Sequence, residues 1–445
     1  MNVHFVSLGC ARNQVDSETM MGRLQSAGWV ITQEPADAEV IVVNTCSFIE
    51  PAVDESIDTI LALANYKKTG VCRRLIVAGC LPERYRADIS GELPEVDVFL
   101  GTGAFDKIID AASEVDMQSA CLLPAPGQEP LRDDGLSRLR PTPHMAYVKI
   151  AEGCSRSCTY CVIPKLRGSR LSRMPDNIVN EVQLLLQSGV RELVLVAQDT
   201  TAYGRDLEPA SDLASLLTRI ESAARESNQD KTPPWIRFLY GHPESIGESV
   251  LETVASLPAI CPYFDIPVQH AADHLLKRMG RHYCKADLIQ LFERIRSTVP
   301  GAALRTTVIV GFPGESDEDA AELKEFVEHV RFDHLGIFRY SDSEDLPSHR
   351  LPNHVSTELA EERYHTLMAI QADISRKTNE KYIGETLRVL VEEKPEENLF
   401  IGRTAFQAPE VDGITYINAS RLDIGTFTNV TITDSYEYDL VGEPA

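Results

Sequence analysis

Apolar runs and helical patterns alternate along the first part of the chain, residues 1–123. Short apolar runs bounded by turn residues are typical of buried strands. The predicted strands are Phe5–Leu8, Val40–Val43 and Leu75–Ala78. Apolar positions at helical spacing predict a helix over Asp16–Ala27, with Asp16 and Glu18 in its first turn and Gly28 as its stop. Strands that alternate with helices predict a mostly parallel, open α/β sheet, which we assign to an N-terminal domain.

A second alternating series fills the middle of the chain. A stretch rich in Pro and Gly, residues 124–143, predicts a linker, and the series that follows covers residues 144–379. Its six predicted strands are Tyr147–Ile150, Leu193–Val196, Ile236–Leu239, Tyr263–Ile266, Thr306–Val310 and Leu335–Phe338. Its predicted helices include Asn177–Gln187, Lys285–Ser297 and Asp317–His329. Six successive βα units predict a full or partial parallel barrel, with ligands at the C-terminal ends of its strands.

The last part of the chain, residues 380–445, changes to short β-rich runs broken by Gly, Pro, Asn and Asp. These runs are Thr386–Val391, Leu399–Thr404, Ile414–Ile417 and Thr426–Thr433. Such a pattern favours a small antiparallel barrel of the OB type. The predicted fold class is therefore a multidomain α/β protein with an open sheet, a parallel (βα) barrel and a small β-barrel.

Charge and targeting features narrow the setting in which the chain works. The formal net charge of −24 disfavours a general affinity for nucleic acid backbone and favours a basic partner, although an acidic surface that only aids solubility is the alternative. No apolar stretch approaches the ~18 residues that a membrane helix needs, and the start of the chain lacks the features of a signal peptide. We expect a cytoplasmic protein without membrane association, whose clustered thiols stay reduced and bind metal.

Three cysteines follow the first strand of the predicted barrel directly. Cys154, Cys158 and Cys161 form the pattern Cys-x3-Cys-x2-Cys. Thiolates are soft ligands that suit iron–sulfur clusters or zinc. Three thiolates on one loop can hold three corners of an iron–sulfur cube and leave the fourth iron open for another ligand. A zinc site completed by a distant His or Cys is the alternative, although zinc loops more often use pairs of Cys-x2-Cys.

Three further cysteines lie in the N-terminal domain, and each directly follows an apolar run: Cys10, Cys46 and Cys80. In an open α/β sheet the crevice beyond the carboxyl ends of the strands binds ligands, so these cysteines could converge there. Gly9 and Gly79 would let the backbone approach a bulky cluster. Three unrelated buried thiols are the alternative. The remaining cysteines show no partner spacing and are interpreted as ordinary reduced thiols: Cys72, Cys121, Cys261 and Cys284.

The spacing of Cys154, Cys158 and Cys161, with the aromatic Tyr160 before the last, resembles the signature of the radical S-adenosylmethionine (SAM) superfamily. The resemblance implies that these cysteines hold a [4Fe-4S] cluster whose open iron is chelated by SAM. Reductive cleavage of SAM would then give a 5′-deoxyadenosyl radical. The resemblance also implies contacts to SAM from segments at the ends of barrel strands. The residues implied are Tyr160, Ala197, Gln198, Asp199, Gln269 and Gly311.

The three predicted domains, in this order and with six cysteines, resemble the methylthiotransferase family, whose C-terminal module is called TRAM. The resemblance covers essentially the whole chain and implies two [4Fe-4S] clusters. The cluster on Cys10, Cys46 and Cys80 would carry a sulfur species methylated by one SAM, and the second cluster would cleave another, so that SAM is both methyl donor and radical source. A reducing partner such as flavodoxin or ferredoxin is implied as well. Members modify an adenosine in tRNA or an aspartate in ribosomal protein S12.

Two features favour the S12 branch of this family. The segments Ala197–Gly204 and Gly402–Gly413 resemble that branch rather than the tRNA branch. Residues 380–445 carry 13 acidic and 5 basic side chains, whereas an RNA-binding barrel normally presents a positive groove. The basic stretch Lys165–Arg170 could still meet RNA or the cofactor carboxylate, or be a plain solvated loop.

We therefore expect the transfer of a methylthio group to the β-carbon of an aspartate in S12, which would be the protein partner, and we expect no tRNA binding. A tRNA adenosine methylthiotransferase is the nearest alternative. A non-catalytic iron–sulfur carrier is an alternative from a different class of protein.

Overall fold

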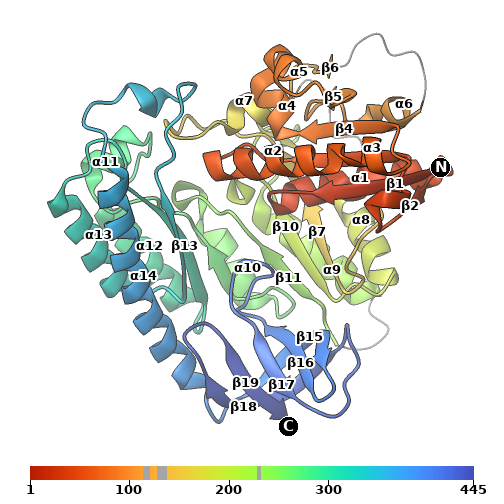
Figure 1. Ribbon diagram of the computed structural model, residues 1–445. Helices are drawn as coiled ribbons and strands as arrows, with labels where there is room; N and C mark the ends of the chain where they lie inside the picture. The colour runs from red at the N-terminus through yellow and green to blue at the C-terminus, as the bar shows by residue number, and fades with distance from the viewer. Residues whose placement is uncertain (114–120, 128–137, 228–231) are drawn as a thin grey trace.

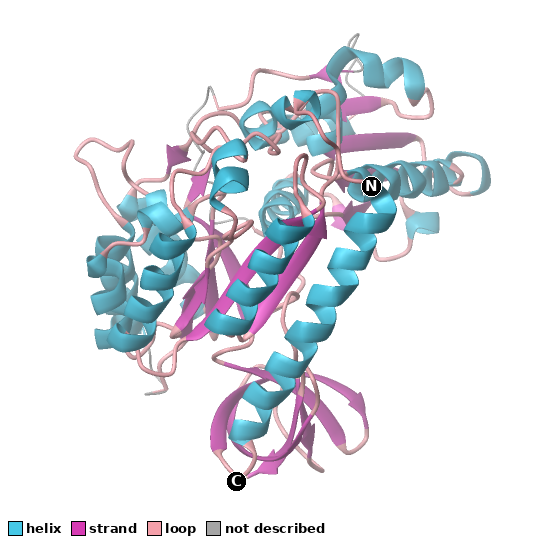
Figure 2. Cartoon of the chain, turned by 90° about the vertical axis from the view of Figure 1, so that its left-hand side faces the viewer, coloured by secondary structure: helices cyan, strands magenta, loops and turns pink. Residues whose placement is uncertain are grey.

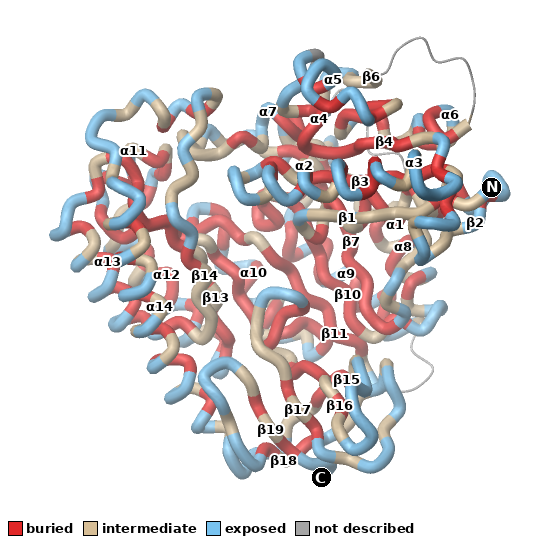
Figure 3. Tube along the Cα trace, in the orientation of Figure 1, coloured by how far each residue is buried: buried red, intermediate tan, exposed pale blue. Residues whose placement is uncertain are grey.

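The computed structural model describes residues 1–113, 121–127, 138–227 and 232–445. Figure 1 shows an open sheet with its helices at the top, a parallel barrel in the middle and a small β-barrel at the bottom. The longest helix, α14 (Thr357–Asn379), runs from the middle part down to the small barrel (Figure 2). The central strands of the open sheet and of the middle part, such as β3 (Val40–Thr45) and β10 (Glu192–Val196), are fully buried, whereas the strands of the small barrel are buried at only some of their positions (Figure 3). Among the described residues, no helix is long and apolar enough to cross a membrane.

The N-terminal part is an open parallel α/β sheet, as predicted. Its strand order is β2-β1-β3-β4-β5-β6, and every pair in it is parallel. The strands are β1 (Asn2–Ser7), β2 (Val30–Ile31), β3 (Val40–Thr45), β4 (Arg74–Gly79), β5 (Val98–Leu100) and β6 (Cys121–Leu122). The helices are α1 (Ala11–Ser26), α2 (Glu50–Ala64), α3 (Tyr66–Thr69), α4 (Cys80–Tyr85), α5 (Ile89–Glu92) and α6 (Ile108–Ala112). Alternate residues of β3 enter two separate apolar cores, one on each face of the sheet.

The predicted start of the first helix is wrong. Helix α1 begins at Ala11, directly after Cys10, so Asp16 and Glu18 lie in its middle rather than in its first turn. Both carboxylates are buried: Asp16 pairs with cations of the next domain and Glu18 with Arg138 of the predicted linker, which explains acidic side chains at these helix positions. Gly28 follows the end of α1 with φ +88°, a conformation that glycine adopts readily.

The middle part is a partial parallel barrel, and all six of its predicted strands are confirmed. They are β7 (Met145–Lys149), β10 (Glu192–Val196), β11 (Trp235–Phe238), β12 (Tyr263–Asp265), β13 (Ala303–Val310) and β14 (His334–Arg339). They form two parallel sheets, β11-β10-β7 and β12-β13-β14, which a parallel bridge from Ile236 to Ile260 connects. The helices around them are α7 (Ile163–Arg167), α8 (Pro175–Gln187), α9 (Leu213–Ser227), α10 (Glu248–Ser256), α11 (Asp273–Arg278), α12 (Lys285–Thr298) and α13 (Asp317–Val330). A two-stranded antiparallel sheet, β8 (Ala151–Glu152) and β9 (Leu171–Ser172), encloses the cysteine loop and α7 between its strands in the sequence.

The interior of the partial barrel is filled from both of the other domains. Outward-facing strand residues pack on the surrounding helices in one large core. Inward-facing residues such as Tyr147 and Tyr263 form a second core, which includes Ala11 and Val15 of α1 and Ala408 of the C-terminal barrel. The barrel strands therefore fix the positions of both neighbouring domains through their inner face.

The C-terminal part is a closed barrel with the strand order β15-β16-β17-β19-β18. Its strands are β15 (Thr386–Glu396), β16 (Leu399–Thr404), β17 (Thr415–Asn418), β18 (Phe427–Ser435) and β19 (Leu440–Pro444). Four of the five were predicted. The fifth, β19, was missed because only two apolar residues, Leu440 and Val441, mark it in the sequence, and it closes the barrel by pairing with β17 in parallel and β18 antiparallel.

Of the described ends of the predicted linker, 124–127 and 138–143, the second is anchored to the protein by a buried side chain. Arg138 is buried and forms ion pairs with Glu18 of α1 and Glu181 of α8. Its side chain is only 5% exposed, so this residue connects the two domains rather than separating them. The predicted domain boundaries stay a prediction.

Candidate functional site

The N-terminal cysteines come together at one edge of the open sheet. Cys10, Cys46 and Cys80 directly follow or closely follow β1, β3 and β4, which are neighbours in the sheet. The strand pairing sets these ends level, with Ser7 opposite Asn44 in β1 and β3. A Cβ atom built on Gly9 would lie 3.1 Å from Cys46 Sγ. The structure therefore brings the three thiols close together at the carboxyl ends of these strands, the crevice in which parallel sheets bind ligands.

The thiols of this crevice experience different electrostatic surroundings. Burial, together with the neighbouring Cys80, raises the pKa of Cys46 to about 11. Burial also raises the pKa of Cys80. Burial acts in the same direction on Cys10, but the cations Arg12 and Arg167 outweigh it, so the pKa of Cys10 ends below its usual value. Since metal binds the thiolates, loading this crevice releases protons.

The donor set and the shape of this crevice fit an iron–sulfur cluster better than a single metal ion. Gly9 has φ +91°, and a Cβ atom there would approach the Cβ of Cys46 to 2.7 Å. In the part of the chain that the structure describes, no three His, Cys, Asp or Glu side chains are placed to hold one metal ion. Three thiols around one crevice suit a polynuclear cluster, in which each thiolate binds a different iron.

The second set of cysteines lies on the loop between β8 and α7, at the C-terminal end of β7. Backbone contacts hold this loop in place: Cys154 N donates to the Gly168 carbonyl at 3.0 Å, and Thr159 N donates to the Met279 carbonyl at 3.1 Å. Burial raises the pKa of Cys161 to about 12. The loop therefore presents its thiols from a backbone that is fixed on both sides.

One predicted SAM contact, Gln198, and the hydrogen-bond partner of another, Arg281, keep buried polar atoms available beside this loop. Gln198 Nε2 donates to Glu152 Oε1 at 2.6 Å, while Gln198 Oε1 is buried and has no hydrogen-bond partner among the described residues. The Tyr160 hydroxyl accepts a hydrogen bond from Arg281 Nη2 at 2.6 Å, and Arg281 Nη1 also lacks a partner within the described ranges. These atoms match the polar groups that a carboxylate and an ammonium group require.

The other predicted SAM contacts lie at the ends of neighbouring barrel strands. Asp199 has both oxygens engaged, by Arg156 Nε at 2.8 Å and by the Thr201 hydroxyl at 2.8 Å. The Ala197 carbonyl accepts a hydrogen bond of 2.9 Å from Nη1 of Arg12, which is a residue of α1. Asp199 therefore helps to pin the cysteine loop through Arg156.

Gln269 and Gly311 follow β12 and β13 and have φ values of +72° and +76°. Both backbones therefore bend sharply at the strand ends, at the face where ligands of such barrels bind. Contact between SAM and the six residues named for it stays a prediction.

Sequence reasoning missed a group of buried charges between the two cysteine sites. Lys149 of β7 and Arg167 of α7 pair with Asp16 of α1 and with Glu152. Burial raises the pKa of Glu152, but Lys149 and Arg167 outweigh it and hold that pKa well below its usual value. The signal in the sequence was the basic stretch around Arg167. Because its side chain is only 3% exposed, Arg167 is not available to RNA or to solvent.

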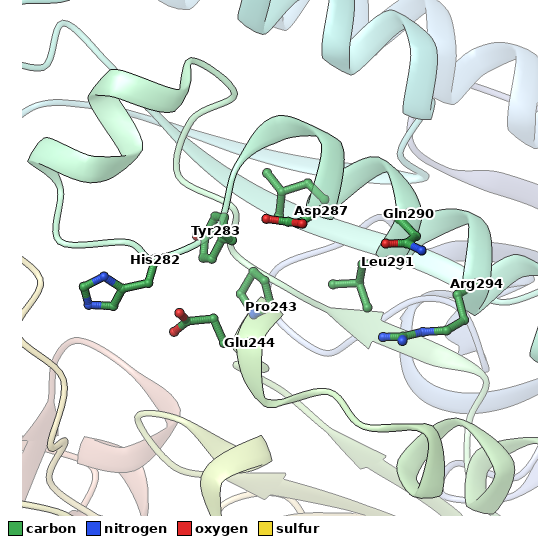
Figure 4. A pocket seen from close by; sticks show the side chains of 9 residues that line it. Pro243, Glu244, His282, Tyr283, Asp287, Gln290, Leu291 and Arg294 are labelled. Carbon is green, nitrogen blue, oxygen red and sulfur yellow. The ribbon is translucent and has the colours of Figure 1, made fainter.

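A separate cavity of about 270 Å³ lies next to the cysteine loop (Figure 4). Its lining comes from the segment after β11 and from α12 and the residues before it: Pro243, Glu244, His282, Tyr283, Asp287, Leu288, Gln290, Leu291 and Arg294. Glu244 connects this cavity to the loop, because its carboxylate pairs with Arg156 Nη1 at 2.6 Å. None of the residues predicted to bind a cluster or SAM lines it.

Comparisons with known proteins agree with this organisation. Three family models match: Uncharacterized protein family UPF0004 over residues 2–101, Radical SAM superfamily over 148–327 and TRAM domain over 383–444. Among solved structures, a radical SAM methyltransferase, TsrM from Kitasatospora setae, superposes with a TM-score of 0.57 at 14% identity, covering 84% of this chain and 89% of that chain. At such low identity this likeness shows the fold alone.

Curated relatives match the chain from end to end. The protein of Desulfosudis oleivorans is 51% identical over 445 residues, covering 100% of both chains. Those of Clostridioides difficile and Geobacter sulfurreducens are 45% and 44% identical, covering at least 99% of this chain and 98% of each relative. All three are named ribosomal protein uS12 methylthiotransferase RimO. This chain therefore belongs to the family of the ribosomal protein uS12 methylthiotransferases.

Proposed function

We propose that this chain transfers a methylthio group to the β-carbon of an aspartate in ribosomal protein S12. The observation that carries the proposal is the 51% identity, over the full length of both chains, to a relative named for that activity. The two sets of three cysteines support it because the reaction needs two clusters with separate tasks. When bound, two [4Fe-4S] clusters and SAM supply the transferable sulfur, the methyl group and the one-electron chemistry that activates an aliphatic C–H bond.

The chain's own residues divide into two sets of cluster ligands. Cys10, Cys46 and Cys80 would hold one cluster, and Cys154, Cys158 and Cys161 would hold the other. Three cysteine thiolates would bind three of the four irons of each cluster, so the fourth iron would be open to a ligand that the protein does not supply.

Side chains around the second cysteine loop would orient SAM and exclude water. Gln198 Oε1 is a buried acceptor suited to the ammonium group of SAM, and Arg281 Nη1 is a buried donor suited to a carboxylate. Arg12 of α1 covers the C-terminal end of β10, since it donates a hydrogen bond to the Ala197 carbonyl and its guanidinium lies 4.6 Å from the ring centre of Tyr240. This closure by another domain favours chemistry protected from solvent.

The charge of the C-terminal barrel favours a protein target over tRNA. Residues 380–445 carry a net charge of −8, which repels a polynucleotide and attracts a basic ribosomal protein. We also propose that the enzyme works in the cytoplasm with a small electron carrier such as flavodoxin or ferredoxin, because its six ligand thiols must stay reduced and its SAM cleavage needs one electron at a time.

One incubation tests the proposed substrate. Anaerobically reconstituted protein is mixed with SAM, a reductant and either S12 or total tRNA, and both substrates are examined by mass spectrometry. We expect a methylthio group on an S12 aspartate and unmodified tRNA. Modification of tRNA alone would contradict the proposal in favour of the tRNA branch. Absence of both products, with no 5′-deoxyadenosine formed, would favour an iron–sulfur carrier.

The N-terminal crevice can be tested through the backbone that borders it. We expect Gly9→Ala to lower the iron content of the reconstituted protein toward half, since the new Cβ would approach Cys46 Cβ to 2.7 Å at a φ of +91°. Gly28→Ala is the matched control, because Gly28 also has a positive φ but no heavy atom of the described residues within 4 Å of the new Cβ. Equal iron content in the two variants, measured with acid-labile sulfide, would show that no cluster lies against Gly9.

A further inference from the structure

Arg167 lies between the two cysteine sites. It ends α7, the helix that directly follows the second cysteine loop, and it reaches into the N-terminal domain. There its Nη2 lies 3.5 Å from Cys80 Sγ. The same nitrogen donates to Asn13 Oδ1, and the Asn13 amide donates to backbone carbonyls at the ends of β1 and β3. One guanidinium therefore contacts a thiol of the N-terminal crevice and the residue that ties two of its strand ends together.

The other arm of Arg167 points to the second cysteine site. Nη1 donates to Asp16 at 2.7 Å and to Glu152 at 3.2 Å. Glu152 lies two residues before Cys154 and also accepts from Lys149 at 2.7 Å. Two cations and two carboxylates thus form a buried group without net charge. Removing the guanidinium charge would leave one negative charge uncompensated beside the N-terminal crevice.

A charge at this position acts strongly on a neighbouring cluster. The reduction potential of an iron–sulfur cluster depends on the net charge around it, on hydrogen bonds to its sulfurs and on solvent exposure. Arg167 supplies a charge and an N–H donor to the Cys80 sulfur, and it is 3% exposed, so water screens it little. Both effects stabilise the reduced, more negative state of a cluster.

We propose that Arg167 is a positioning residue that raises the reduction potential of the cluster in the N-terminal crevice. The inference rests on the proposed function, because it requires a cluster on Cys10, Cys46 and Cys80. It assigns a role to a residue outside both ligand sets.

The potential can be measured in a full-length chain that keeps only the N-terminal site, with Cys154, Cys158 and Cys161 each replaced by alanine. Reductive titration followed by electron paramagnetic resonance compares Arg167, Arg167→Met and Arg167→Lys in this background. We expect the methionine variant to shift the one-electron equilibrium at least tenfold toward the oxidised state, about 59 mV. The lysine variant keeps the charge, so its reduction potential should stay close to that of the parent.

Arg138→Met is the matched control. Arg138 is 5% exposed, pairs with Glu18 of the same helix α1, and has no hydrogen bond to a cysteine in the described part of the chain. This variant should lose stability, as Arg167→Met does, but keep the potential of the parent. Should Arg167→Met fail to fold, Arg167→Gln removes the charge and keeps an amide donor for Asp16, and the same shift is expected.

The outcomes separate the inference from the proposed function. A parent chain that binds no iron would overturn the proposed function itself. A loaded parent whose potential is unchanged in the Arg167 variants would overturn only the inference. An equal shift in the Arg138 and Arg167 variants would also overturn it, because the effect would then come from loosened domains and not from the contact with Cys80.

Discussion

Replacing Cys154 with alanine should abolish the cleavage of SAM and leave the N-terminal cluster in place. The three thiols of this loop act as one site, so the loss of one ligand removes the site. The thiols of Cys10, Cys46 and Cys80 lie on a different sheet with its own crevice and should keep their iron. We expect 5′-deoxyadenosine to fall to the level of a blank without enzyme, and iron per chain to fall to about half of the parent.

The matched control for this prediction is Cys284→Ser. Cys284 is the N-cap residue of α12 and takes part in a capping box with Asp287. Serine is a favoured N-cap residue, so this change removes a thiol without a cost to the helix. We expect it to keep both the iron content and the formation of 5′-deoxyadenosine. Undiminished 5′-deoxyadenosine from the Cys154 variant would show that the cluster ligands are misassigned.

The sequence predicted the fold well where strands are continuously apolar. Buried parallel strands such as Val40–Thr45 and Glu192–Val196 are covered on both faces, so they appear as apolar runs that alternate with helical patterns. Strand β19 was missed because a short strand in a small barrel buries few side chains, chiefly Leu440. Strands were therefore predicted where several neighbouring apolar side chains are buried, and missed where few are.

Contacts between domains left little trace in the sequence. Asp16 was interpreted as a helix-start residue because a carboxylate in the first turn of a helix interacts favourably with the positive end of the helix dipole. Its partners, Lys149 and Arg167, come from distant parts of the chain. Likewise, local patterns gave no reason to place Arg138 of the predicted linker against Glu181. A buried ion pair needs a partner that only the tertiary structure identifies.

The segment Gly402–Gly413, used above as a mark of the S12 branch, attaches the C-terminal barrel to the parallel barrel. Arg403 pairs with Glu192 of β10, and Asp412 pairs with Arg305 of β13 at 3.3 Å. Tyr263 of β12 donates its hydroxyl hydrogen bond to Asp412 at 2.6 Å. The resemblance of this segment to the family therefore reflects how the barrel is docked, beside any part it has in choosing the target.

Replacing Glu192 with glutamine should be among the most destabilising single changes in this docking region. Glu192 is fully buried and pairs with Arg403 of the C-terminal barrel and with Arg237 of β11 at 3.0 Å. Arg237 is itself fully buried and has no other carboxylate partner among the described residues. Breaking a buried pair while its partner stays charged costs about 3–5 kcal/mol. We expect a loss of that size in urea denaturation followed by tryptophan fluorescence in a Trp29→Phe background, where Trp235, which packs against Phe427 across this interface, is the remaining tryptophan.

Two comparisons decide whether the charge of Glu192 is responsible for that loss. Asp176→Asn, in an exposed pair with Arg219, should cost at most about 1 kcal/mol. Burial raises the pKa of Glu192, but Arg403 and Arg237 outweigh it and hold the pKa below the ordinary value of 4.5. A carboxylate whose pKa is lowered by folding stabilises the protein at a pH above its unfolded-state pKa, and this stabilisation is lost as the pH falls. The difference in the free energy of unfolding between the parent and Glu192→Gln should therefore narrow below pH 4.5. A gap that is independent of pH would mean that packing, and not the buried ion pairs, accounts for the loss.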